Sequence, residues 1–283
     1  VVYRKPGDKR WTPVLDIDRR DDFEILRSQI VKADLYALSN RERNTVALVR
    51  VDLETGIERV VAQKDEADIL SVMFLNETEN TPDLVAYIKN GFPDIEALTS
   101  AGERFRAMVK KRHRPTSGGI LGQSSDGRFV TTAERNGSGP SSFFLLDLER
   151  GTKERLGSTP LSKWVEDLSQ MTPETIPARD GLKLPVLLTL PINRPPENLP
   201  SVVMVHGGPA VSFTFGFDPD VQMLANRGYA VLQVNFRGST DFGKAFRAAG
   251  YGEAGKAMQD DIVDAARWLI EKGIADPARM VVM

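Results

Sequence analysis

The sequence predicts two parts of different fold class: a partial β-propeller followed by an α/β sheet. In the first part, short strands are separated by turns, and a pattern of strand, turn, strand and hairpin at 35–61 returns at 127–156. A degenerate repeat of this kind is typical of propeller blades. From about residue 171, apolar strands alternate with helical segments, as in an α/β sheet. We therefore expect one part over residues 1–168 and a second over residues 169–283.

Each expected strand of the first part is a short apolar run next to a polar or glycine-containing turn. The runs are 35–38, 46–53, 57–61, 69–75, 84–88, 127–133, 143–148 and 153–156. They make up about three blades, too few to close a ring, and an antiparallel sandwich is the alternative. Residues 101–111 differ, because Phe105, Met108 and Val109 recur at helical spacing. This spacing predicts a helix inserted in a blade, with these side chains used for packing.

The second part alternates strands with helices. The expected strands are 183–190, 201–205, 229–234 and one beginning at Met280, and the expected helices are 221–226 and 257–272. The strand 201–205 is apolar throughout, as a sheet covered on both faces requires. Gly228 and Gly273 follow the two helices and favour their ends.

Composition excludes several classes of function. The 283 residues carry a net charge of −2 with basic residues spread along the chain, which argues against nucleic acid as a partner. The longest basic cluster, Lys110–Arg114, is interpreted as a solvated helix end or loop. The absence of cysteine excludes disulfides and thiolate zinc sites, and two distant histidines, His113 and His206, make a metal centre improbable. No apolar run approaches the roughly 20 residues of a membrane span, so we expect no membrane partner.

The most informative chemical motif is His206-Gly207-Gly208, directly after a buried strand. In acyl-transfer hydrolases a His-Gly-Gly loop at this point supplies a backbone N–H group to the oxyanion hole. Glycine suits the role because it lets the main chain approach the substrate oxygen without a side-chain clash. The alternative is a glycine-rich turn with an incidental histidine.

Around this motif the sequence resembles the prolyl oligopeptidase family, especially its acylaminoacyl-peptidase and dipeptidyl-peptidase relatives. The segments that carry the resemblance follow one another over about 110 residues: 178–182, 206–209, 224–231, 234–240, 241–244, 260–262, 268–269 and 275–279. The resemblance implies a partial β-propeller followed by a partial α/β-hydrolase domain with a mostly parallel sheet. It also implies a serine peptidase that hydrolyses short peptides by Ser-His-Asp acyl transfer, with no cofactor and with the propeller restricting access.

The resemblance assigns His206, Gly207 and Gly208 to the oxyanion loop. Some family members use a tyrosine hydroxyl near His206, so here we expect the donor to be the backbone of Gly207 or Gly208. The family's nucleophile elbow, Gly-x-Ser-x-Gly, normally follows the strand that begins at Arg279, and the chain contains no such motif. The triad Ser, Asp and His are therefore expected beyond Met283, and the chain alone is expected to be an inactive fragment.

Arg237 is the main candidate for structural support of this site. It follows a buried strand, and it is expected to pair with Asp260 or Asp261 and hold the loop beneath the site. The alternative is a solvated arginine in a turn.

Other polar and glycine-rich segments are interpreted without a catalytic role. Gly250–Lys256 fits a dinucleotide fingerprint and most of a phosphate loop, but no strand is predicted before it and Ala257 replaces the required Ser or Thr. We interpret it as a loop entering the long helix. Ser138, Ser239 and Thr240 are interpreted as turn residues, and the acidic cluster is read as solvated surface: Asp16, Asp18, Asp21 and Asp22.

Two further functions stay open at this point: an esterase on the same fold, and a non-catalytic propeller/hydrolase-like binding module. A peptide substrate is the partner expected of the full-length enzyme. The sequence leaves open homo-oligomerisation, substrate length, and a cytoplasmic or periplasmic location. A chain that ends inside a strand, with an open propeller, predicts exposed apolar edges and association.

Overall fold

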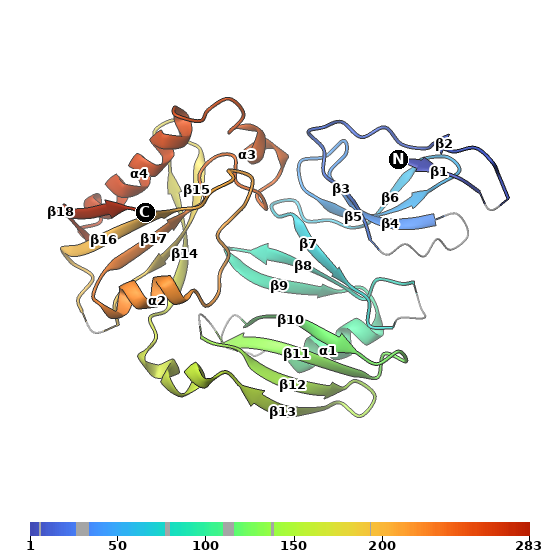
Figure 1. The fold of residues 1–283 in the computed structure, drawn as a ribbon, viewed down its shortest axis with the longest axis horizontal. Helices are drawn as coiled ribbons and strands as arrows, with labels where there is room; N and C mark the ends of the chain where they lie inside the picture. Colours follow the sequence, from blue (N-terminus) through green and yellow to red (C-terminus); the bar gives the residue numbers. More distant parts are fainter. Residues whose placement is uncertain (6, 27–33, 77–79, 110–115, 137–138, 193) are drawn as a thin grey trace.

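The computed structural model contains three antiparallel sheets followed along the chain by a mixed sheet flanked by helices (Figure 1). The structure describes residues 1–283 except 6, 27–33, 77–79, 110–115, 137–138 and 193, so the basic cluster Lys110–Arg114 and Ser138 lie outside the described residues. A short hairpin of β1 (Val2–Tyr3) and β2 (Thr12–Pro13) precedes the first of the three sheets. Within the described part, no helix is long and apolar enough to cross a membrane.

The first antiparallel sheet has the order β3-β4-β5-β6. Its strands are β3 (Phe23–Ile25), β4 (Asp34–Ser39), β5 (Ala47–Asp52) and β6 (Glu58–Ala62). Alternate residues of β5 enter different apolar clusters: Val49 and Val51 pack with Leu35, whereas Leu48 packs with Ile69 of the next sheet. Side chains of one strand point alternately to the two faces of a sheet, so β5 contributes to an apolar cluster on each face.

The second and third sheets are joined through a helix. The second sheet contains β7 (Ile69–Met73), β8 (Leu84–Lys89) and β9 (Phe92–Ala97), and the third contains β10 (Thr116–Gln123), β11 (Phe129–Asn136), β12 (Ser142–Asp147) and β13 (Thr152–Ser158). Between them runs α1 (Ser100–Val109), whose Phe105 packs with Leu84 of β8 and Val130 of β11. The predicted helix and its packing role are confirmed, and the helix follows a sheet of only three strands.

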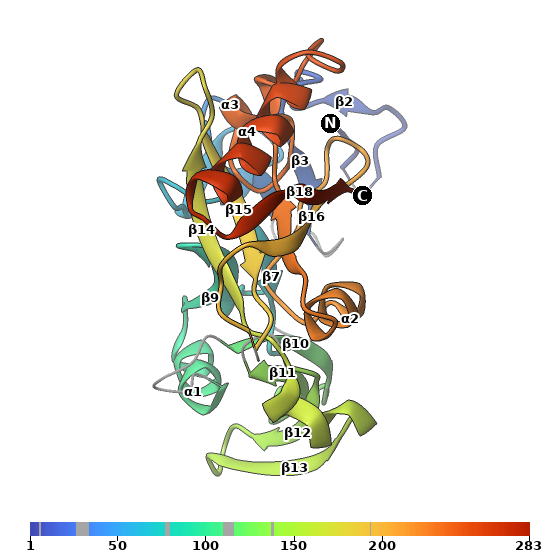
Figure 2. The same cartoon turned by 90° about the vertical axis from the view of Figure 1, so that its left-hand side faces the viewer.

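The mixed sheet has the order β14-β15-β17-β16-β18. A 3-10 helix, η1 (Pro160–Asp167), leads into its strands, which are β14 (Met171–Pro177), β15 (Lys183–Thr189), β16 (Leu199–Val205), β17 (Ala230–Val234) and β18 (Ala275–Val282). Its helices are α2 (Pro219–Asn226), α3 (Lys244–Ala248) and α4 (Ala257–Glu271). Val203 of β16 packs with residues of α4, whereas Val202 and Met204 pack with Val221 of α2. The helices α2 and α4 therefore cover opposite faces of the sheet, as the two views show (Figures 1 and 2).

The expectation of a mostly parallel sheet holds for the strand directions but not for every pairing: β14, β16, β17 and β18 run in one direction, and β15 runs against them. β16 pairs in parallel with β17 and β18, but β15 pairs antiparallel with both β14 and β17. For β14 and β15 the physical reason is the short connection between them, a turn at 178–182 closed by the hydrogen bond from Ala178 N to Leu182 O at 2.8 Å. Parallel neighbours need a crossover of a dozen or more residues, which this turn does not supply.

The change from antiparallel sheets to the mixed sheet falls between Ser158 and Met171. The domain boundary after residue 168 stays a prediction. On the edge strand β18, Val281 and Val282 are exposed, and association of the chain through such edges also stays a prediction.

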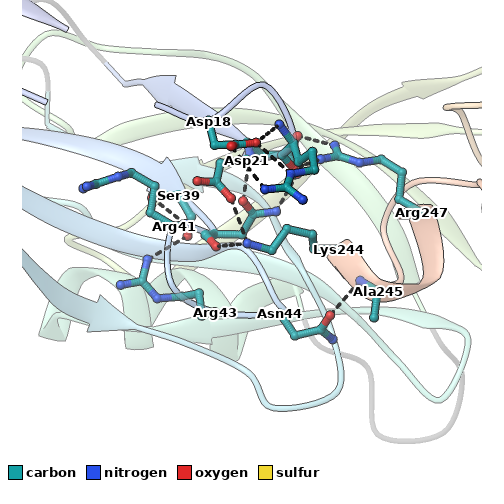
Figure 3. A network of polar contacts seen from close by, with 12 residues as sticks. Asp18, Asp21, Ser39, Arg41, Arg43, Asn44, Lys244, Ala245 and Arg247 are labelled. Atoms are coloured by element: carbon teal, nitrogen blue, oxygen red, sulfur yellow. Dashed lines mark hydrogen bonds and ion pairs between the residues drawn. The ribbon is translucent and has the colours of Figure 1, made fainter. Parts of the chain in front are cut away.

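Contacts between the two parts form the polar network drawn in Figure 3. Lys244 Nζ of α3 lies 2.8 Å from Asp21 Oδ1 and 3.2 Å from Asn40 O, and Arg247 pairs with Asp22. Asn44 completes the network by accepting hydrogen bonds from the Lys244 and Ala245 amides, each at 2.8 Å.

The acidic cluster at the start of the chain was only half correctly predicted as solvated surface. Asp16 and Asp18 are exposed, as expected. Asp21 and Asp22 instead pair with cations of α3 more than 200 residues away in the sequence. No local sequence pattern indicates an ion pair between residues so far apart in the chain.

Candidate active site

The glycine loop His206–Pro209 lies directly after β16, at the carboxyl end of the parallel strands. Ligands of open α/β sheets bind at this edge. At Gly208, φ is +122° and an added Cβ would lie 2.8 Å from Ala210 N, so this position requires glycine. Within the described part of the chain, the amides of Gly207 and Gly208 donate no hydrogen bond. Both glycines are exposed, so their two N–H groups are available as donors at the edge where a substrate would bind.

The His206 ring is fixed by contacts on several sides. It stacks on Phe236 with ring centroids 4.6 Å apart and meets the edge of Phe213 at 5.1 Å. Its Nε2 lies 2.9 Å from Ser239 Oγ, and its Nδ1 lies 3.0 Å from Gly207 O. The histidine therefore connects the glycine loop to the segment that follows β17.

Asn235 is the first residue of that segment, and it holds the far side of the loop. Its buried side chain accepts a hydrogen bond from Phe213 N at 2.7 Å and donates one to Phe213 O at 3.1 Å. Farther along, Thr240 N donates to Val211 O at 3.2 Å. Residues 206–213 thus rest on residues 235–240 through side chains and backbone.

Arg237 lies in a buried ion-pair network. Its Nε and Nη2 donate to the two carboxylate oxygens of Asp261 at 2.9 and 2.7 Å, and its backbone N–H donates to Oδ2 at 2.9 Å. Its Nη1 lies 2.8 Å from Asp180 Oδ2. The hydrogen bond to Asp261 is the main cause that raises the pKa of Arg237, and the hydrogen bond from Arg237 is the main cause that lowers the pKa of Asp180.

Of the two carboxylates expected beside Arg237, Asp261 makes the contact and Asp260 does not. Asp261 is fully buried on the inner face of α4, whereas the half-exposed Asp260 pairs with Arg179 at 2.7 Å. Arg179 also binds Asp264 with its side chain and its backbone N–H. Because only 10% of the Arg237 side chain is exposed, the alternative of a solvated turn arginine does not describe this residue.

The glycine-rich segment Gly250–Lys256 has a packing role at its first residue. It follows helix α3, where a dinucleotide fingerprint would need a strand. A Cβ on Gly250 would lie 2.5 Å from the Cα of Gly238 and 2.7 Å from Met258 Cε. Gly250 therefore allows this segment to pack closely against the residue that follows Arg237.

A cavity of about 770 Å³ lies between the two parts of the molecule. The second sheet contributes Tyr87 and Asn90, and the mixed sheet and its loops contribute Glu174, Phe213 and Phe242. Phe213 lines this cavity and also packs against His206, so one side chain connects the cavity to the glycine loop. Within the described residues, no group of three or more His, Asp or Glu side chains could hold a metal ion.

Comparison with known proteins agrees with this geometry. The model of the prolyl oligopeptidase family matches residues 215–283. The dipeptidyl aminopeptidase BIII of Pseudoxanthomonas mexicana is 31% identical over 293 residues, which cover 100% of this chain and 42% of that protein. The chain belongs to the prolyl oligopeptidase family.

Other members of the prolyl oligopeptidase family match parts of the chain or its fold. Dipeptidyl peptidase family member 6 of Caenorhabditis elegans is 52% identical over 82 residues, 29% of this chain and 11% of that protein. Prolyl oligopeptidase B from Galerina marginata superposes with a TM-score of 0.78 at 18% identity, over 96% of this chain and 38% of that one. The chain thus spans less than half the length of these relatives.

Family membership confirms the resemblance found in the sequence. The family model covers Arg237, Ser239 and Asp261 but begins after His206–Gly208, so the role of the glycine loop in this prolyl oligopeptidase relative rests on its own geometry. Sequence reasoning missed Ser239, which was interpreted as an ordinary turn residue. The structure buries it completely and places it against His206. No local signal distinguishes such a serine from a solvated one.

Proposed function

We propose that the chain is part of a serine peptidase that hydrolyses short peptides, and that His206, Gly207 and Gly208 form its oxyanion loop. The observation that carries the proposal is the pair of unbonded glycine amides at the carboxyl edge of the parallel strands. When a serine attacks a peptide carbonyl, negative charge develops on the carbonyl oxygen, and preorganised N–H donors stabilise it. The cavity between the two parts has room for short peptide side chains.

The proposed domain organisation has two parts. Residues 1–168, with the three antiparallel sheets, form blades of a partial β-propeller. Residues 169–283 form the N-terminal part of an α/β-hydrolase domain. Support comes from the succession of antiparallel sheets, from the helices on both faces of the mixed sheet, and from the match to prolyl oligopeptidases over nearly all of the chain. Access to the site through the space between the two parts follows from this arrangement.

We place the triad Ser, Asp and His in sequence beyond Met283. The chain contains no Gly-x-Ser-x-Gly motif. Met283 lies beside β16, because its N–H donates to Val203 O at 3.0 Å and its carbonyl accepts from Val205 N at 2.9 Å. A segment that continues from Met283 would emerge next to His206, which is where a nucleophile elbow must lie to use the loop. The chain alone is then expected to lack hydrolase activity.

In this proposal Arg237 and Asp261 support the site from below. They tie the segment after β17 to helix α4, and that segment carries Phe236 and Ser239, which contact His206. Asp260 supports the site indirectly, because it pairs with Arg179 in the turn between β14 and β15. A peptide substrate, the absence of nucleic-acid and membrane partners, and homo-oligomerisation stay predictions.

The test uses the protein encoded with its downstream sequence. We expect it to react with a fluorophosphonate probe and to release short products from peptide substrates. Gly208→Ala is expected to lower kcat by about 10²–10³-fold and to slow probe labelling without removing it, because the added methyl displaces the donor loop and leaves the serine in place. Cleavage of simple esters without measurable cleavage of any peptide would favour an esterase. A downstream sequence without Gly-x-Ser-x-Gly, and no labelling, would favour the non-catalytic binding module.

A further inference from the structure

We propose that Ser239 is a positioning residue for the oxyanion loop, acting through His206. The inference deepens the proposed function and rests on it. Ser239 is fully buried, and its hydroxyl oxygen lies 2.7 Å from Phe236 O and 2.9 Å from His206 Nε2. It is the polar contact that links the imidazole to the segment after β17.

The hydrogen positions follow from the chemistry of the partners. The serine hydroxyl has one hydrogen, and the Phe236 carbonyl can only accept. At 2.7 Å two oxygens need a hydrogen between them, so the hydroxyl donates to Phe236 O. Ser239 Oγ must then accept from the histidine, which places a hydrogen on Nε2 of His206. A ring turned by 180° would present a carbon to Ser239 and lose this bond.

The ring orientation matters because His206 also contacts the peptide that carries one of the candidate donors. Nδ1 lies 3.0 Å from Gly207 O, and because a carbonyl oxygen only accepts, this contact is a hydrogen bond when Nδ1 carries a hydrogen as well as Nε2. The Gly207 carbonyl and the Gly208 N–H belong to one planar peptide, and in a trans peptide the two bonds point in opposite directions. The imidazole therefore occupies the carbonyl side, and the Gly208 N–H points away from it. Through this contact, Ser239 sets the direction of the Gly208 donor.

The competing explanation is that Ser239 is only a buried hydroxyl satisfied by a nearby carbonyl. The chain offers a matched control for that case. Ser201 of β16 is also fully buried, and its hydroxyl donates to Leu199 O at 3.1 Å. Ser201 makes no hydrogen bond to His206 among the described residues. Ser201→Ala therefore removes the same chemical group without touching the loop.

The first measurement follows the imidazole itself in this chain. The 283 residues contain only two histidines, His113 and His206, so ¹⁵N-histidine labelling gives few signals, and His113→Gln assigns them. We expect a hydrogen-bearing Nε2 in His206, a change of its signals in Ser239→Ala, and no change in Ser201→Ala. A His206 Nε2 without hydrogen, or identical His206 signals in Ser239→Ala and the parent, would overturn the proposal.

The second measurement uses the complete enzyme and separates kcat from KM. Loss of one oxyanion donor lowers kcat by about 10²–10³-fold, and a misdirected donor should cost about tenfold. We expect Ser239→Ala to lower kcat about tenfold with KM unchanged. The kcat of Ser239→Cys should lie between those of Ser239→Ala and the parent enzyme, and Ser201→Ala should keep the parent values of kcat and KM. Urea midpoints check that the variants fold. Equal kcat values in the Ser239 and Ser201 variants would refute the positioning role.

The two measurements distinguish the failure of each idea. A complete protein without hydrolase activity, whose His206 signals still respond to Ser239→Ala, would remove the proposed function and keep the contact. An active enzyme in which neither Ser239 variant changes kcat would keep the proposed function and remove the positioning role.

Discussion

Substitution of Arg237 by alanine should destabilise the mixed sheet more than any exposed charge substitution. Only 10% of the Arg237 side chain is exposed, and its partner Asp261 is fully buried. Arg237→Ala leaves that carboxylate without its cation and, among the described residues, with a single hydrogen bond, from the backbone N–H of residue 237. Removal of one partner of a buried ion pair costs about 3–5 kcal/mol, because the other charge stays buried and unpaired.

The contacts of the network place the expected loss near the lower end of that range. Asp180 is half exposed, so it regains water when Arg237 is removed, and its contribution is close to that of a surface pair, about 0–1 kcal/mol. Asp261 keeps its backbone hydrogen bond at 2.9 Å. We therefore expect a loss of about 3 kcal/mol in the free energy of unfolding.

Urea unfolding followed by tryptophan fluorescence measures this loss. Asp260→Ala is the matched control, because Asp260 is 47% exposed and its loss should cost at most about 1 kcal/mol. The double variant Arg237→Met with Asp261→Leu should be more stable than Arg237→Ala, since apolar replacement of a whole buried pair is often neutral. A loss below about 1 kcal/mol in Arg237→Ala, or a double variant no more stable than it, would refute the reasoning.

Three further changes test other parts of the structure. Burial raises the pKa of Asp68 above its usual value, so the contribution of Asp68 to stability is complete below the pKa of the unfolded chain and is lost as the pH rises through the folded-state pKa. Asp68→Asn should remove this fall from urea midpoints measured from about pH 4 to 7, and parallel pH profiles would contradict it. Gly250→Ala should lower the free energy of unfolding by about 1–3 kcal/mol, because the added Cβ would lie 2.5 Å from Gly238 Cα. Gly119→Ala is the control, since a Cβ there would meet no atom within 4 Å. Equal thermal midpoints for the two variants would contradict the packing argument. Lys244→Met removes the contacts of the Lys244 ammonium group with Asp21 and Asn40 O, and it should speed limited proteolysis between the two parts of the molecule. An unchanged cleavage rate would show that these contacts do not hold the two parts together.

Elements with a clear apolar period could be predicted from the sequence. Helix 257–272 is observed as Ala257–Glu271, and strand 46–53 as Ala47–Asp52. The strands β9 and β10 were missed for a physical reason. β9 contains Pro93 and two acidic residues, and β10 contains three glycines, so neither has the apolar alternation that marks a strand. These two segments are strands because they form backbone hydrogen bonds with β8 and β11, and not because of their own side-chain pattern.

The candidate site divides in the same way. The glycine loop could be located from the sequence because an oxyanion loop requires particular residue types, His-Gly-Gly, at adjacent positions after a strand. The partner of Arg237 could be narrowed only to two neighbours, Asp260 and Asp261, since the choice depends on which face of α4 is buried. Ser239 and Asp22 could not be identified, because their partners lie 33 and 225 residues away and leave no local pattern.

An exposed, glycine-rich loop cannot fix its own conformation, so contacts with another part of the protein must do so. Here they come from the segment after β17, the central strand of the mixed sheet, which is paired on both sides. Every residue of that segment makes a contact that supports the site: Asn235 holds Phe213, Phe236 stacks on His206, Arg237 binds α4, Gly238 packs on Gly250, and Ser239 is hydrogen-bonded to His206. A site held to a small tolerance needs its supporting residues on a rigid element, and a central strand is the most rigid one available. Substitutions in residues 235–239 should therefore disturb the loop geometry more than substitutions at its exposed tip, Pro209 and Ala210, which carry no comparable support.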